Sequence, residues 1–342
     1  MGHATLETLV PSGPSRNGLP RRVVVAFGGN ALIRRGERGE YDQQRANVDV
    51  AARAITALAR LVPEVVVTHG NGPQIGFLAL QSEAALPDVP APPLDVLGAE
   101  SQGQIGYMLS QALGNRFASE GTYRDIAVVL TQVVVDAGDP AFERPTKPVG
   151  PVYTEEEAHR LQRERGWAIA PDNEHWRRVV PSPAPRRIVE AEAIRTLVER
   201  GVLVIASGGG GVPVVEHGGH QIRGVEAVID KDLAAVVLAA SLEADGLILL
   251  TDVDAVYCGW GKPGARPLST LTLAEADELL ANGTLPAGSM APKVRACAQF
   301  VRAGGMVAAI GALDDVVGVL SGRTGTMVIA EPGVDSAATG NA

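Results

Sequence analysis

The sequence predicts an α/β protein, a three-layer αβα sandwich with a mostly parallel central sheet and a protruding subdomain. Short β-branched runs alternate with helical stretches along most of its 342 residues. Most of these runs are apolar at consecutive positions, as strands are when helices cover both faces of a parallel sheet. One proline-rich stretch, residues 136–185, interrupts the alternation. The alternation predicts the sandwich, and the interruption predicts the subdomain.

The strands of the central sheet are predicted from runs of β-branched and other apolar residues. In the first run every residue after Arg22 is apolar, so both faces of that strand are expected to be covered. The predicted strands, in chain order, are Arg22–Phe27, Glu64–His69, Ile126–Leu130, Val202–Ala206, Gly246–Thr251, Met306–Ile310 and Thr326–Ile329.

The helices are predicted from apolar residues at helical spacing and from signals at the helix ends. Thr272 and Glu275 form a capping box, which predicts a helix that ends near Asn282. Gly304 and Gly305 are expected to close the helix that follows it. The other predicted helices are Gln43–Arg60, Gly103–Ser119, Arg187–Arg200, Lys231–Ser241 and Lys293–Ala303.

Residues 136–185 are predicted to form a subdomain that projects from the sandwich. They contain their own capping box at Thr154 and Glu157, which predicts a helix within the stretch. An irregular surface loop is the alternative, but so long a loop in a compact domain is usually functional or disordered. The predicted division is a disordered leader over 1–20, an N-terminal lobe over 21–135, the protruding subdomain over 136–185 and a C-terminal lobe over 186–342.

The composition excludes several classes of protein. The net charge is −9 and the basic clusters are short and scattered, so no nucleic-acid surface is predicted. No apolar run reaches the roughly 18 residues of a membrane span, and the first twenty residues lack the apolar core of a signal peptide. The two cysteines and six histidines show no metal-ligand spacing. We therefore expect a cytoplasmic protein with no nucleic-acid or membrane partner and no metal held by the chain itself.

Glycine-rich segments follow several predicted strands, where open α/β sheets bind ligands. They are Gly28-Gly29-Asn30, Gly70-Asn71-Gly72 and the run of four glycines that includes Gly208 and Gly209. Glycine lets backbone N–H groups approach an anion closely, and a phosphate is the natural candidate for the long run. The shorter segments fit ordinary tight turns equally well. Ser101 and Gln102 are predicted near a helix start, where free N–H groups hold small anions or simply cap the helix.

Three lysines stand where a cation would meet a phosphoryl group. Lys147 lies in a stiff, proline-rich loop, so its amine is presented at little ordering cost. Lys231 lies between Asp230 and Asp232 at the head of a predicted helix. Lys293 lies at another helix start, where a cation is unfavourable unless an anion shares the site. Each lysine alone also fits a solvated surface group, but the set matches phosphoryl transfer by positioning and electrostatics.

Taken in order, the motifs resemble those of the carbamate kinases, which belong to the amino acid kinase family. The resemblance runs from about Arg22 to Ile329. The insert PTKPVGP (145–151) separates carbamate kinases from the wider family. The other specific motifs are GGNAL (28–32), THGNGPQ (68–74), SQGQIGY (101–107), RVVPSP (178–183), GGGGVPV (208–214), VIDKD (228–232) and GSMAPKV (288–294).

The resemblance implies reversible phosphoryl transfer between ATP and carbamate, in the catabolism of arginine and carbamoyl phosphate. It implies the amino acid kinase fold, with carbamate or carbamoyl phosphate bound by the N-terminal lobe and the nucleotide bound by the C-terminal lobe. The protruding subdomain would lie over the acceptor site. It also implies Mg²⁺ as the cofactor of ATP or ADP, and a homodimer.

The family's functional residues are carried over motif by motif. Lys147, Lys231 and Lys293 are expected to contact the phosphoryl groups, and Asp232 to orient the lysines. The acceptor and phosphate sites are expected to be lined by Gly28, Gly29, Asn30, Gly70, Asn71, Gly72, Ser101, Gln102, Gly208 and Gly209. Residues expected beside the nucleotide are Asp252, Tyr257, Met290 and Lys293.

Asn30 carries the main distinction from other amino acid kinases. Most relatives that act on amino-acid carboxylates place a lysine after the glycine pair, and we hypothesise that Lys147 replaces that cation. An acetylglutamate-type or uridylate-type kinase is the alternative enzyme, and both Asn30 and the insert argue against it. A nucleotide sensor without catalysis is the alternative from another class, and the complete set of lysines argues against it. Ala291 departs from the family, which usually has glycine there.

Overall fold

The structure is a computed structural model that describes residues 19–33, 37, 39–172, 174–218, 221–286 and 288–330. The side chain of Asn30 also lies outside the described part. All but two residues of the predicted leader lie outside it as well, so the disordered leader stays a prediction.

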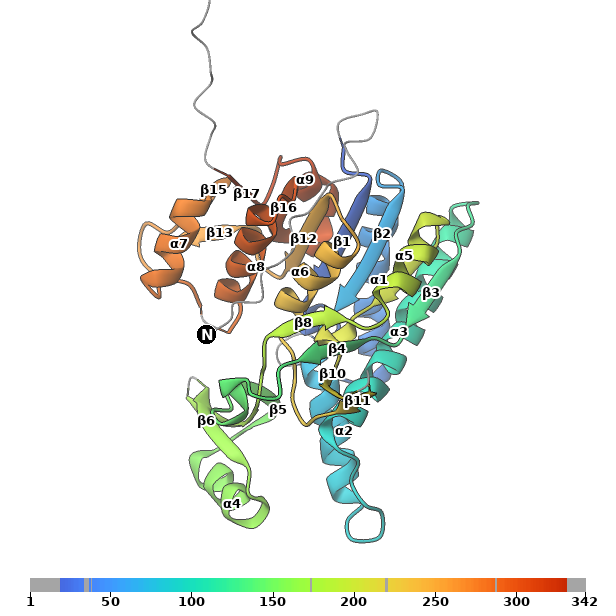
Figure 1. Ribbon diagram of the computed structural model, residues 1–342. Helices are drawn as coiled ribbons and strands as arrows, with labels where there is room; N and C mark the ends of the chain where they lie inside the picture. The colour runs from blue at the N-terminus through green and yellow to red at the C-terminus, as the bar shows by residue number, and fades with distance from the viewer. Residues whose placement is uncertain are drawn as a thin grey trace, which may run out of the picture.

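An eight-stranded sheet forms the centre of the molecule (Figure 1). All its neighbouring strands pair in parallel except β16 and β17. In spatial order the strands are β15 (Thr270–Thr272), β17 (Thr326–Ile329), β16 (Val307–Ala312), β12 (Gly246–Thr251), β1 (Arg22–Phe27), β2 (Glu64–His69), β9 (Leu203–Ala206) and β3 (Ile126–Val129).

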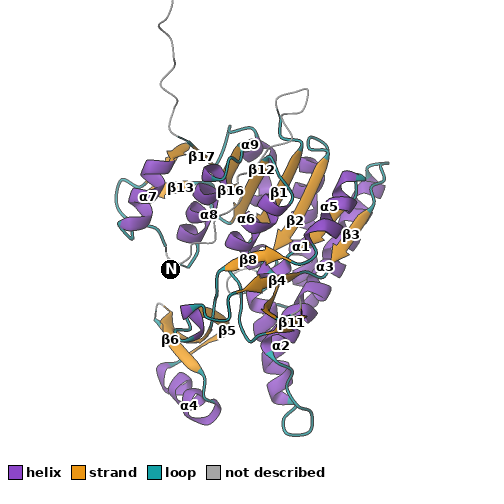
Figure 2. Cartoon of the chain, in the orientation of Figure 1, coloured by secondary structure: helices purple, strands orange, loops and turns teal. Residues whose placement is uncertain are grey.

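Helices cover both faces of this sheet (Figure 2). Val23 and Val25 of β1 pack into one apolar cluster, whereas Val24 and Ala26 pack into the other. This explains the unbroken apolar run of β1, because no position on the strand faces water. The first cluster includes α1 (Tyr41–Ala59), α3 (Leu94–Ser119) and α9 (Val316–Leu320), and the second includes α5 (Ala191–Glu199), α6 (Lys231–Ser241), α7 (Leu273–Ala281) and α8 (Met290–Arg302). The predicted αβα sandwich is confirmed.

Smaller sheets complete the fold. A four-stranded sheet has the order β11 (Gln221–Gly224), β10 (Val212–His217), β4 (Gln132–Val135) and β8 (Pro185–Ile188), and a hairpin pairs β13 (Val256–Cys258) with β14 (Arg266–Leu268). The short 3-10 turns are η1 (Gly29–Ala31), η2 (Pro140–Phe142), η3 (Gly208–Gly210) and η4 (Leu313–Asp315). Strands β8, β11, β13 and β14 are short and partly exposed, whereas β4 and β10 contain short buried apolar runs.

The stretch 136–185 projects from the sandwich beside α2 (Gly72–Ala84) (Figure 1). Its antiparallel strands have the order β5 (Lys147–Tyr153), β7 (His175–Val180) and β6 (Ala168–Asp172), with α4 (Glu155–Arg165) packed on them. Thr154 and Glu157 exchange the hydrogen bonds of a capping box, as predicted. Lys147 is the first residue of β5, so the subdomain carries it toward the sandwich.

Several predicted boundaries moved. Four strands and α6 match residue by residue, but α3 begins at Leu94 rather than at Gly103. The predicted helix from Arg187 begins at Ala191, because β8 occupies the residues before it. The division at residue 186 stays a prediction, and the strand order marks no boundary there, since β9 lies between β2 and β3. Within the described ranges, no helix is long and apolar enough to cross a bilayer.

Candidate active site

A cleft of about 540 Å³ opens at the carboxyl ends of three central strands. It is the kind of crevice in which open α/β sheets bind ligands. Gly28 and Gly29 follow β1 into it, and helices α6 and α8 begin at its wall. The residues that line it are Gly28, Gly29, Ala31, Val50, Lys147, Asp230, Lys231, Asp232, Leu250, Thr251, Asp252, Gly288, Ser289, Lys293, Ala312, Leu313 and Asp314.

Asp232 holds two of the predicted lysines. Both its carboxylate oxygens lie 3.1 Å from Nζ of Lys231, and its Oδ2 lies 3.0 Å from Nζ of Lys293. The side chains of Asp232 and Lys293 are only 4% and 5% exposed. The expected orienting contact between Asp232 and these lysines is therefore present in the geometry, while the catalytic roles stay predictions.

The charges of this trio follow from burial and proximity. Burial alone would raise the pKa of Asp232, but the charges of Lys231 and Lys293 outweigh it and lower that pKa. Burial alone would lower the pKa of Lys231, but the nearby carboxylates outweigh it and raise that pKa. Burial lowers the pKa of Lys293 to about 8, and the charge of Lys231 adds to the effect. Near pH 7 all three groups are charged, and Lys293 is the first lysine to lose its proton as pH rises.

Lys147 reaches the same cleft from the protruding subdomain. Its Nζ donates to Oδ2 of Asp230 at 2.7 Å. Burial alone would raise the pKa of Asp230, but the charges of Lys147 and Lys231 lower it well below its ordinary value. Three lysines from three separate segments thus surround two adjacent carboxylates. Such a cluster can hold phosphoryl oxygens without reorganising.

A second group of predicted residues packs beside the glycine pair. A Cβ on Gly70 would lie 2.5 Å from the backbone nitrogen of Gly29, so the loops after β1 and β2 touch. Nδ2 of Asn71 donates to Oγ of Ser101 at 2.7 Å. Gly72 begins α2, next to this contact.

The expectation that Ser101 and Gln102 lie at a helix start is wrong. Both lie inside α3, which begins at Leu94, so their N–H groups belong to the helix interior. Gln102 acts through its side chain instead, since its amide exchanges hydrogen bonds of 3.0 and 2.9 Å with the backbone of Thr131. Pro93 precedes the helix and was the signal that could have located its start.

The run of four glycines is enclosed by protein atoms. A Cβ on Gly208 would lie 2.5 Å from Nε2 of His69, and one on Gly209 would lie 2.1 Å from Nδ2 of Asn71. Gly209 also has a positive φ of 68°. The need for glycine here comes from these side chains, so a phosphate is not required to explain it. Burial lowers the pKa of His69 to about 4, and its neutral ring serves as packing.

The residues predicted beside the nucleotide divide into two groups. Asp252 lines the cleft together with Lys293. Tyr257 donates to Asp254 at 3.0 Å and packs against Trp260, and it is not among the described residues that line the cleft. Met290 is 8% exposed and packs in an apolar core cluster. Asn30 cannot be placed, because its side chain lies outside the described part.

Sequence reasoning did not commit to four polar residues that line the cleft. They are Asp230, Thr251, Ser289 and Asp314. Thr251 is the last residue of β12 and Asp314 follows the end of β16, so their place at the carboxyl ends of predicted strands was a usable signal. Asp230 precedes α6, where an aspartate is expected as a helix cap. This common role explained the residue in the sequence, so its contact with Lys147 was not predicted.

No cluster of three or more metal-ligating side chains occurs in the part of the chain that the structure describes. This agrees with a metal that arrives with a nucleotide, because Mg²⁺ usually takes only one or two carboxylates besides phosphates and water. Asp252 and Asp314 line the cleft and offer such carboxylates. The site therefore fits Mg²⁺ without a preformed protein cage.

Known proteins match this chain over most of its length. A model of the amino acid kinase family matches residues 21–311. The carbamate kinase of Pyrococcus horikoshii is 49% identical over 313 residues, which cover 91% of this chain and 99% of the relative. The chain belongs to the carbamate kinases of the amino acid kinase family. It is therefore a kinase, a phosphotransferase that binds a nucleotide.

Further relatives agree with this membership. The carbamate kinase of Haemophilus influenzae is 49% identical over 309 residues, covering 90% of this chain and 96% of the relative. The solved carbamate kinase from Giardia lamblia bound to AMP-PNP gives a TM-score of 0.83 at 44% identity, covering 91% of this chain and 99% of that one. The fold and the family predicted from the motifs are confirmed.

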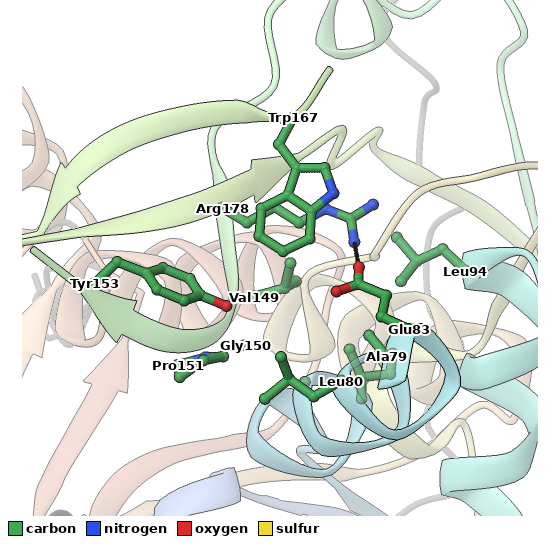
Figure 3. A pocket seen from close by; sticks show the side chains of 12 residues that line it. Ala79, Leu80, Glu83, Leu94, Val149, Gly150, Pro151, Tyr153, Trp167 and Arg178 are labelled. Atoms are coloured by element: carbon green, nitrogen blue, oxygen red, sulfur yellow. Dashed lines mark ion pairs between the residues drawn. The ribbon is translucent and has the colours of Figure 1, made fainter. Parts of the chain in front are cut away.

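Contacts with α2 fix the subdomain that carries Lys147 (Figure 3). Glu83 of α2 pairs with Arg178 of β7, at 3.9 Å, and also with Arg165. The guanidinium of Arg178 lies 4.8 Å from the centre of the Trp167 ring. Arg178 pairs in the ladder with a residue of β5, two positions after Lys147. The position of Lys147 is therefore tied to α2.

Gly76→Ala is expected to lower kcat/KM about tenfold or more. A Cβ at Gly76 would lie 2.3 Å from Cα of Gly150, so β5 must shift and take Lys147 with it. Misplacement of a catalytic group by about 1 Å costs up to roughly a hundredfold. Steady-state kinetics check this against Gly114→Ala, a helical glycine where an added Cβ meets nothing within 4 Å. Equal kinetics for the two variants would contradict it.

The pKa of Lys293 predicts an alkaline limit on activity. If its charge binds phosphoryl oxygens, kcat/KM should fall as pH rises through about 8, because the free enzyme then loses this proton. Lys293→Arg should have a lower maximum rate and no such fall, since arginine stays protonated. A pH profile of kcat/KM for both proteins measures this. An identical alkaline fall in Lys293→Arg would assign the limit to another group.

Proposed function

We propose that this chain catalyses reversible phosphoryl transfer between ATP and carbamate, that is, ADP + carbamoyl phosphate ⇌ ATP + carbamate. The observation that carries the proposal is the convergence of Lys147, Lys231 and Lys293 on one cleft, with Lys147 delivered by the family's distinctive insert. The named relatives are carbamate kinases, which supports the same acceptor. A place in arginine and carbamoyl phosphate catabolism is proposed from the family resemblance.

The protein contributes to this reaction mainly by positioning the substrates and by neutralising charge. Toward ATP, an oxygen of the ADP β-phosphate attacks the phosphorus of carbamoyl phosphate. The bond from phosphorus to the carbamoyl oxygen breaks, and carbamate leaves as an anion with that electron pair. No proton moves, so no general acid or base is needed. The three lysine cations would neutralise the transferring group, and the carboxylates would keep them in place.

The acceptor side is proposed around the glycine pair. Gly28, Gly29 and Asn30 follow β1, and Gly70 packs directly against Gly28 and Gly29. The remaining predicted acceptor residues are Asn71, Gly72, Ser101, Gln102, Gly208 and Gly209. Beside them, Oγ of Ser207 is buried and has no hydrogen-bond partner among the described residues.

The nucleotide side is proposed at the ends of β12 and β16. Asp252 and Lys293 line the cleft there, which supports their predicted roles. Tyr257 and Met290 are proposed beside the nucleotide from the family resemblance. Mg²⁺, bound with ATP or ADP, would neutralise phosphate charge, and Asp252 and Asp314 would be carboxylates available to hold it.

Two further properties are proposed from the family, and a third, the cellular location, is proposed from the sequence. The working direction is toward ATP, the assembly is a homodimer, and the location is the cytoplasm. No described residue bears on the first of these, because the same cleft serves both directions. Light scattering of the purified protein tests the homodimer.

The proposed function is tested by coupled detection of ATP formed from ADP, Mg²⁺ and carbamoyl phosphate. Acetyl phosphate is the control donor, and omission of Mg²⁺ with added chelator is the control for the cofactor. We expect rapid ATP formation that depends on both carbamoyl phosphate and Mg²⁺. Binding of ADP without ATP formation would overturn the proposal and favour a nucleotide sensor.

A further inference from the structure

We infer that Asp230 is a positioning residue, which holds the amine of Lys147 where it meets the transferred phosphoryl group. The inference deepens the proposed function and rests on it for its catalytic readout. Asp230 lines the cleft, and its carboxylate makes contacts of two kinds. Each of its oxygens has a separate task.

One oxygen of Asp230 caps a helix. Its Oδ1 accepts from the backbone nitrogens of Asp232 at 2.9 Å and Leu233 at 3.3 Å, so it fixes the first turn of α6. That turn carries Lys231 and Asp232. The cap therefore sets the geometry of the buried trio.

The other oxygen of Asp230 reaches across to the subdomain. Its Oδ2 accepts from Nζ of Lys147 at 2.7 Å, across 83 positions of sequence. The Lys147 side chain is 31% exposed, and that of Asp230 is 17% exposed, so the pair is partly shielded from water. This hydrogen bond connects the start of β5, which carries Lys147, to the start of α6.

The pair extends an alternating row of charges. Lys147 contacts Asp230, Lys231 and Lys293 contact Asp232, and the two aspartates are two residues apart. One helix start thus anchors three lysines from three segments. A lysine has a long, flexible stem, and its charge is useful only when held at the reacting atoms. Asp230 supplies that restraint for Lys147, as Asp232 does for the other two.

The plain alternative is that Asp230 only caps α6. Asp230→Asn separates the two tasks, because asparagine caps helices as well as aspartate does, while its NH₂ group cannot accept from an ammonium. Asp230→Ser also keeps a capping oxygen and has no second oxygen for Lys147. Both variants keep the cap of α6 but lose the charge that Lys147 and Lys231 stabilise, so both should lower the melting temperature, and by similar amounts.

The first test is a double-mutant cycle in the ATP-forming assay. We expect Asp230→Asn to lower kcat about tenfold or more and to leave KM for ADP within about twofold. In Lys147→Ala, adding Asp230→Asn should cost less than about threefold further, because its effect passes through Lys147. Asp277→Asn, which breaks an exposed ion pair with Arg302, is the matched control and should keep wild-type kcat.

The second test needs no activity. Lys147 is acylated with an amine-reactive ester and its modification is followed by mass spectrometry. Release from Asp230 should speed labelling of Lys147 several-fold in Asp230→Asn and in Asp230→Ser, with no change in Asp277→Asn. Unchanged labelling, a wild-type kcat in Asp230→Asn, or a full additional loss in the double variant would each overturn the inference. An inactive wild type would instead overturn the proposed function, while the labelling result still decides the role of Asp230.

Discussion

Lys147→Ala is expected to lower kcat/KM for ATP formation by about a hundredfold to a thousandfold. Removal of one preorganised group that stabilises transition-state charge typically costs this much. Lys147 is the cation that the insert brings to the cleft, where it lies 2.7 Å from Asp230. The side chain is partly exposed, so the free energy of unfolding should change by no more than about 1 kcal/mol. Steady-state kinetics and urea denaturation measure the two effects.

Arg160→Ala is the matched control for this prediction. Arg160 is a cation of the same subdomain, on α4, with an exposed side chain paired to Glu164. Its loss should leave kcat/KM unchanged. A Lys147→Ala enzyme within a few-fold of wild type would contradict both the role of this lysine and the idea that it replaces the cation missing at Asn30.

The central sheet could be predicted because its signal is local. A strand that is covered on both faces is largely apolar at consecutive positions, and β1, β2, β12 and β17 were predicted from such runs with their correct bounds. Strands β8 and β11 of the small four-stranded sheet are short and partly exposed, and they lack that pattern. They form where segments that are distant in sequence come together, and a local run of residues does not predict such pairing.

Helices with internal glycines were the hardest to predict. Gly98 and Gly103 lie within α3 and concealed its first turns. Gly76 lies within α2, where its lack of a side chain lets the backbone of Gly150 approach. Glycine is required at position 76 because of a contact with a residue 74 positions away. Helix propensity, which is local, does not predict a glycine there.

The candidate site was predictable where one residue type implies one chemistry. Three lysines, two at helix starts and one in a stiff loop, pointed to phosphoryl groups together with the strand-end glycines, and the geometry gathers all three lysines. The sequence did not show which aspartate pairs with which lysine. Asp230 and Asp232 are alike in sequence, yet one holds the subdomain lysine and the other holds the buried pair. The reason for the long glycine run was also non-local, because His69 and Asn71 press on it from the loop after β2.

Asp232→Asn is expected to lower the free energy of unfolding by about 3–5 kcal/mol near pH 7, and to reduce kcat strongly. The variant leaves two charged lysines in the site without their shared carboxylate, and breaking a buried ion pair in this way costs about that much. Lys293 is 5% exposed and cannot turn its charge to water without moving α8. Urea denaturation of the purified protein measures the loss, with the slope m showing whether unfolding stays two-state.

The pH dependence separates lost charge from lost packing. The folded-state pKa of Lys293, about 8, lies below its ordinary value of 10.5, so the folded protein gives up this proton before the unfolded chain does. Stability therefore rises with pH between about 8 and 10.5 as far as this group is concerned. At pH 9 one of the two unpaired cations in Asp232→Asn is largely gone, and the loss should be smaller than at pH 7. Adding Lys293→Met to Asp232→Asn should recover part of the loss at pH 7 for the same reason. A loss that is equal at both pH values and unaffected by the second substitution would mean that Asp232 stabilises the fold by packing, and that the lysines do not depend on its charge.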